Sequence, residues 1–88
     1  MNSLKTLCEE MLDDSRVIGV VGKDPHGHTK TLFKGTVLDV WKNRKGVLSN
    51  YMYADVIDIA PATIHLDMET ALRGLKVTVL VKYGFKED

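Results

Sequence analysis

A run of alternating side chains near the end of the chain, at residues 75–83, constrains the fold more than any other feature. Its odd-numbered positions are apolar or aromatic, whereas Lys76, Thr78 and Lys82 occupy even-numbered positions, with Leu80 as the exception. Successive side chains of an extended strand point to opposite faces, so this run predicts a β-strand in a sheet with one apolar face. The residues expected to point inward are Leu75, Val77, Val79, Val81 and Tyr83.

Four other segments have the composition of strands: residues 16–22, 31–41, 51–60 and 63–68. The first is short and rich in β-branched residues, and Gly19 within it indicates a bulge or a close backbone approach. In the second, Gly35 lies where the apolar face changes sides, as a bulge would produce.

The segment between residues 61 and 74 contains the turns that should separate the last strands. We expect Pro61 and Ala62 to form a tight turn, followed by residues 63–68 as a strand. The inward side chains of that strand would be Ile64, Leu66 and Met68. Residues 69–74 are either one helical turn ended by Gly74 or a loop.

Residues 3–13 predict an amphipathic helix. Apolar residues recur there at helical spacing, namely Leu4, Leu7, Cys8, Met11 and Leu12. Ser3 or Asn2 can cap the start, since either side chain can accept a hydrogen bond from a free backbone N–H. A helix of this length is marginal in water, so it must be stabilised by packing on the sheet.

Together these elements predict an α+β fold: an N-terminal helix packed on a twisted, mostly antiparallel sheet of about five strands. The links are too short for crossovers between parallel strands, which favours a meander, either open or curled into a small barrel. The 88 residues form a single domain, residues 1–88, with a thin core. An edge strand that pairs with a second copy, forming a homodimer, would add burial.

The composition bounds the compartment and the general kind of partner. Cys8 is the single cysteine and cannot form an internal disulfide. The start of the chain lacks the features of a signal peptide, and no apolar run approaches the roughly 18 residues needed to span a bilayer. We therefore expect a cytoplasmic protein without membrane contact. A formal net charge of zero argues against strong non-specific binding of nucleic acid.

The basic middle of the chain contains the strongest candidate binding site. Residues 15–46 hold seven basic and two acidic residues. We expect a hairpin tip near residues 42–46, with aromatic side chains beside the cations. The predicted partner-binding residues are Trp41, Lys42, Arg44, Lys45 and Tyr51. Such a set suits an acidic protein surface, where Trp, Tyr and Arg are frequent interface residues. It also suits single-stranded nucleic acid, while a third reading is that the aromatics merely pack the hairpin.

The remaining polar residues do not form a recognisable catalytic motif. His26 and His28, two positions apart in a turn, could share a metal, but two ligands on a turn do not make a site. Asp55 and Asp58 have opposite parity on one strand and would not face each other without a bulge. Cys8 has no evident basic partner. We therefore predict no enzyme activity, no metal and no cofactor.

The order of elements is similar to that of Sm-like and other small SH3-like barrels. The resemblance rests on a helix followed by bent strands, and on glycine-bearing strands at residues 33–37 and 73–77. The Asp and Asn pair with which Sm proteins hold RNA bases has no counterpart here, so no binding residue is transferred. By size and layout the whole chain also resembles small uncharacterised proteins of bacteriophages and prophages.

These observations predict a non-catalytic protein-binding module. The phage-like layout implies an accessory protein that modulates or inhibits a host complex, for example a bacterial defence system. The alternative is a small nucleic-acid-binding protein that uses the basic hairpin.

Overall fold

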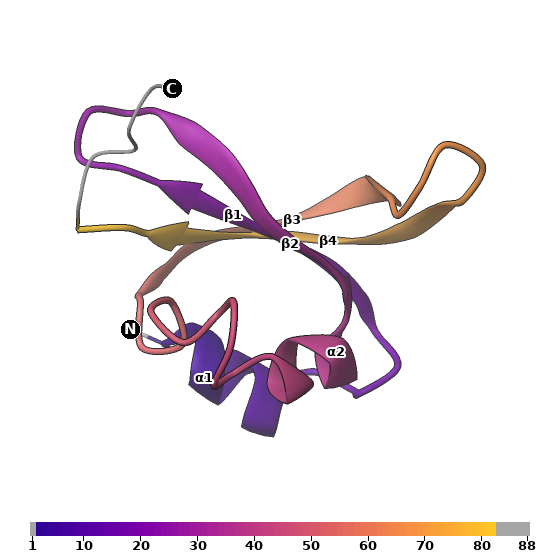
Figure 1. The fold of residues 1–88 in the computed structure, drawn as a ribbon, viewed down its shortest axis with the longest axis horizontal. Helices are drawn as coiled ribbons and strands as arrows, with labels where there is room; N and C mark the ends of the chain where they lie inside the picture. Colours follow the sequence, from indigo (N-terminus) through magenta and orange to yellow (C-terminus); the bar gives the residue numbers. More distant parts are fainter. Residues whose placement is uncertain (1, 83–88) are drawn as a thin grey trace.

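A twisted four-stranded sheet, with the helices against one face, forms the fold (Figure 1). The computed structural model describes residues 2–82. In chain order the elements are α1 (Leu4–Thr6), the π-helical turn η1 (Leu7–Met11), β1 (Val17–Lys23), β2 (Thr29–Thr36), α2 (Val37–Lys42), β3 (Val56–His65) and β4 (Ala71–Leu80). The predicted α+β class is confirmed, but the sheet has four strands and is not closed into a barrel.

The sheet is mixed: two of its three strand pairs are antiparallel, which matches the prediction in part, but the predicted meander order is wrong. Its order is β2-β1-β4-β3, with antiparallel outer pairs and a parallel central pair of β1 and β4. The two central strands carry the most apolar inner face: Ile18 and Val20 of β1 and Val77 and Val79 of β4 have no exposed surface. Because β1 and β4 are central, each has a neighbouring strand on both of its edges. The chain between them is long enough to return in the same direction through β2, α2 and β3.

Two strands that the sequence predicts as separate form one continuous strand, β3. Residues 51–60 and 63–68 were expected to be separate strands around a turn at Pro61 and Ala62, but β3 runs through both residues. Because β3 lies at the edge of the sheet, a proline can occupy it without the loss of an internal ladder bond. The actual turn follows at residues 66–70, where Asp67 Oδ1 accepts hydrogen bonds from the N–H groups of Glu69 (2.8 Å) and Thr70 (2.7 Å).

The predicted strand at residues 31–41 is also divided. The strand β2 ends at Thr36, and α2 begins there because Thr36 and Asp39 form a capping box. Asp39 N–H donates to Thr36 Oγ1 (3.2 Å), while Thr36 N–H donates to Asp39 Oδ2 (3.0 Å). The bulge lies at Leu32, which the β1–β2 register skips, rather than at Gly35.

The core lies between the sheet and the helices. Its buried residues are Leu4, Leu7, Cys8, Ile18, Val20, Val37, Val40, Leu48, Met52, Val77 and Val79. The inward face predicted for β4 is confirmed through Val81, and Tyr83 lies outside the described residues. The predicted helix at residues 3–13 is confirmed in part: the helical residues end at Met11, Leu12 is extended, and Met11 is exposed. There Leu12 N–H bonds to Leu7 O (3.1 Å), and this wider turn rotates the stripe away from helical spacing.

Candidate functional site

The predicted basic patch lies on α2 and the turns after it, not on a hairpin tip. Trp41 and Lys42 end α2, whereas Arg44, Lys45 and Tyr51 lie in a series of turns at residues 43–53. These turns reach back into the core through Leu48 and Met52, which are buried.

Two members of this patch bind each other. The Arg44 guanidinium carbon lies 4.4 Å from the Trp41 ring centroid, and Arg44 Nη1 donates to Trp41 O at 2.8 Å. Trp41 and Tyr51 are half-buried and pack against the core. Lys42 and Lys45 remain exposed as positive charges. A role for these five residues in partner binding stays a prediction.

The loop that carries His26 and His28 is organised by a buried carboxylate. Asp24 Oδ1 accepts hydrogen bonds from the N–H groups of His26 (2.9 Å) and His28 (2.8 Å). Gly27 takes the positive φ that this turn requires. His28 Nδ1 lies 3.4 Å from the other Asp24 oxygen. Within residues 2–82 no group of three or more His, Cys, Asp or Glu side chains could hold a metal ion.

Cys8 is a core residue without the properties of a nucleophile. Burial, with a smaller contribution from the nearby charge of Glu9, raises the pKa of the Cys8 thiol to about 11. At neutral pH the thiolate is therefore a negligible fraction.

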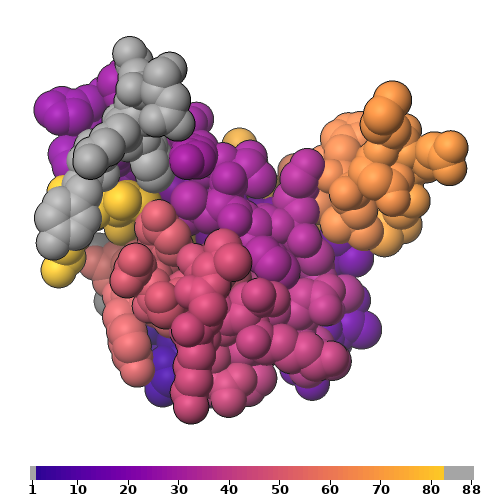
Figure 2. Space-filling view, viewed as in Figure 1, coloured from indigo at the N-terminus to yellow at the C-terminus, as the bar shows by residue number. Residues whose placement is uncertain are grey.

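The most distinctive surface feature is the projecting end of the β3–β4 hairpin, residues 61–74, which we call the arm. Figure 2 shows it in orange, standing out from the rest of the molecule. Met68 at its end is fully exposed, and Leu66 and Leu72 are 39% and 42% exposed. The predicted inward orientation of Leu66 and Met68 is thus wrong, because β3 ends at His65 and both residues lie in the turn that follows it.

Only one of the large apolar residues in the arm is buried. Ile64 packs over two glycines: its Cδ1 lies 3.0 Å from the position that a Cβ of Gly19 would occupy, and its Cγ1 lies 3.1 Å from that of Gly74. A Cβ on Gly74 would also overlap the backbone of Val17. The absence of a side chain at Gly19 thus leaves room for the side chain of Ile64. The sequence had indicated a bulge or a close backbone approach at this position. Gly74 lies inside β4 and ends no helix.

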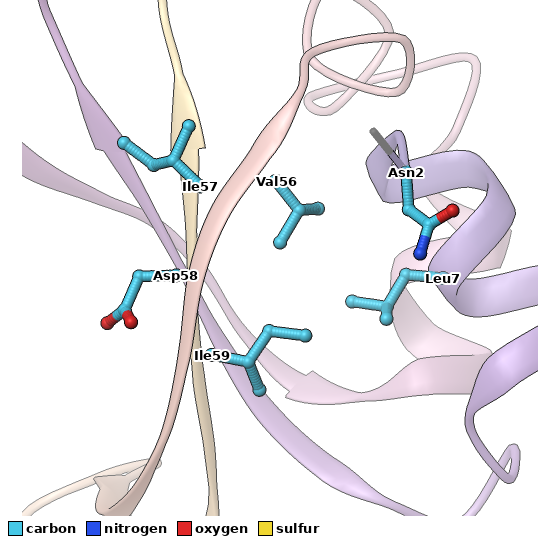
Figure 3. A pocket seen from close by; sticks show the side chains of 6 residues that line it. All are labelled: Asn2, Leu7, Val56, Ile57, Asp58 and Ile59. Atoms are coloured by element: carbon cyan, nitrogen blue, oxygen red, sulfur yellow. The ribbon is translucent and has the colours of Figure 1, made fainter.

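A second surface feature lies beside the first residues of β3 (Figure 3). It is an open hollow of about 480 Å³ lined by Asn2, Leu7, Val56, Ile57, Asp58 and Ile59. Val56 and Ile59 point toward Leu7, whereas Ile57 and Asp58 point to the opposite side of the strand (Figure 3). The β3–β4 register shifts between Val56 and Asp58, and this bulge places two successive side chains on one face.

Comparisons with known proteins do not identify this chain. No protein family, curated protein or solved structure matches it. The resemblances to small barrels and to phage proteins therefore stay predictions. Among residues 2–82, no helix is sufficiently long and apolar to cross a bilayer.

Proposed function

We propose that this protein is a non-catalytic protein-binding domain that contacts its partner through the arm. The observation that carries the proposal is the exposure of Leu66, Met68 and Leu72 at the end of a projecting hairpin. Burying a large apolar side chain contributes about 1.5–3 kcal/mol, so three such residues can form the centre of a small interface. Within the domain Met68 gains none of this energy, and Leu66 and Leu72 gain only part of it.

The charges of the arm favour a protein over a nucleic acid. Asp67 and Glu69 flank Met68 in the turn, and both are exposed. Acidic side chains at a contact surface repel phosphates, whereas an apolar centre with a polar rim is typical of protein interfaces. The nucleic-acid alternative depends on the patch on α2, where Arg44 and Trp41 already bind each other.

The more specific part of the proposal concerns the partner. The phage-like layout of the sequence suggests that the partner belongs to a host complex, such as a bacterial defence system. Modulation of that complex would require no chemistry from this chain.

Affinity capture from bacterial lysate, with and without nuclease, tests the proposal. The captured protein is purified and its affinity is measured for the original chain, for the Met68→Ser/Leu72→Lys variant and for Val47→Ser. Val47 is the matched control because it is 68% exposed outside the arm. We expect binding to survive nuclease and Val47→Ser, and to weaken at least tenfold in the arm variant.

Three other outcomes contradict the proposal. If the Met68→Ser/Leu72→Lys variant binds the partner as tightly as the original chain does, the arm is not the binding site. Capture that disappears with nuclease indicates nucleic acid instead. Loss of binding only when Lys42, Arg44 and Lys45 are replaced by Ala moves the site to α2.

A further inference from the structure

The edge of the sheet beside the hollow is only partly covered. Immediately before β3 begins, the chain pairs on its outer side with the N-terminal segment through the antiparallel bridge between Ser3 and Asp55. Val56 N–H donates to Asn2 O at 2.9 Å, and Leu4 N–H donates to Ala54 O at 3.2 Å. Within residues 2–82 this pairing stops there, and no strand or bridge lies on the outer side of residues 57–65.

The exposed edge next to the hollow offers both backbone and side-chain contacts. An edge strand leaves backbone N–H and C=O groups available to an added strand. Alternate side chains of that strand would enter the hollow between Leu7 and Ile59, and Ile59 is 43% exposed. Pro61 lacks an N–H and interrupts the edge, so the available stretch is residues 57–60.

The charges beside residues 57–60 indicate which kind of ligand this edge would bind. Asp55 and Asp58 are exposed, and within residues 2–82 neither side chain forms an ion pair or hydrogen bond. Lys76 of β4 lies opposite Ala60 of β3, but it makes no ion pair with Asp58. Two copies paired through this edge would bring their aspartates together, which is destabilising. A nucleic acid would be repelled for the same reason.

We propose that β3 at residues 57–60 binds an extended segment of another protein by strand addition, with apolar side chains in the hollow and Lys or Arg beside Asp55 and Asp58. The N-terminal segment already occupies the first part of this edge in the same manner. The site is separate from the arm, so either proposal can fail without the other.

A labelled heptapeptide of alternating Lys and Val tests the site directly by fluorescence anisotropy. Because backbone hydrogen bonds supply much of the affinity in strand addition, a generic alternating peptide is an adequate probe. We expect saturable binding to the full chain, with the corresponding Glu–Val peptide at least tenfold weaker. Hydrogen exchange should slow for amides of residues 57–60 when the Lys–Val peptide is bound.

Substitutions at the edge and, as a control, on the arm show where the Lys–Val peptide binds. Ile59→Lys and Asp58→Lys should each weaken the Lys–Val peptide about tenfold, while Leu72→Lys should have no effect. Leu72 is the control because its side chain is 42% exposed and lies on the arm. Thermal unfolding of each variant checks that the domain is folded.

Several results would overturn the proposal. Absence of saturable binding by the Lys–Val peptide would do so, as would equal affinity for the Glu–Val peptide. The same holds if Leu72→Lys weakens binding as much as Ile59→Lys. Light scattering that shows a dimer dissociated by Ile59→Lys would assign the edge to a second copy.

Discussion

Val77 and Val79 in the body of the molecule have no exposed surface, whereas Met68 in the arm is fully exposed, although all three belong to one hairpin. The body comprises residues 2–60 and 75–82, where α1, η1, α2 and the turns cover the sheet (Figure 1). None of the helices in the described part of the chain, residues 2–82, covers the arm. The comparison shows that apolar side chains of this hairpin are buried where the helices cover the sheet and are exposed in the turn that projects beyond it.

The largest effect on stability should come from Val79→Asp in the body. This change places an unpaired charge in the core, which costs about 5 kcal/mol or more and should unfold so small a domain. The measurement is circular dichroism with chemical denaturation, and Val47→Asp at an exposed position is the control. A soluble Val79→Asp protein that unfolds cooperatively would contradict the assigned inner face.

The junction between body and arm should give the next largest effect. A Cβ at Gly74 would overlap the Val17 carbonyl, so Gly74→Ala should destabilise the domain by about 1–3 kcal/mol. Gly46→Ala is the control, since its Cβ would lie 3.9 Å from Asn43 O. Equal unfolding midpoints for the two variants would show that the arm is not held to β1 at this point.

A smaller effect is expected at the start of α2. Thr36→Ala removes one half of the capping box and should cost about 1 kcal/mol, whereas Thr36→Ser should retain most of it. Hydrogen bonds from the Thr36 N–H and hydroxyl lower the pKa of Asp39. A folded-state pKa below the unfolded value stabilises the protein above about pH 4, and this contribution is lost on acidification. The difference between Thr36→Ala and the original chain should therefore shrink at pH 3, as measured by urea denaturation.

The smallest effect on stability belongs to the arm. Met68→Ser should change the free energy of unfolding by less than about 0.5 kcal/mol, because the side chain is already in water. The same substitution contributes to the loss of partner binding proposed above. A Met68→Ser variant destabilised as much as Gly74→Ala would mean that the arm packs on the body, and the comparison would fail.

Much of the fold was predictable where the local pattern is complete. The inner face of β4 follows from alternation, the first strand from its β-branched residues, and the N-terminal helix from helical spacing. The capping box of Thr36 and Asp39 is also a local signal, and reading it would have ended β2 at Thr36. The candidate site was less predictable, since Met68 and Leu66 have the same apolar character as the buried residues.

The sequence by itself therefore determined the secondary-structure class, the core of β4 and the buried positions Leu4, Leu7 and Cys8 of α1 and η1, because these depend on the period of side chains along a strand or helix. The tertiary structure alone decided the parallel pairing of β1 with β4, the continuation of β3 through Pro61 and the exposure of the arm. Strand neighbours and burial depend on which distant segments meet, and periodicity along the chain contains no information about those meetings.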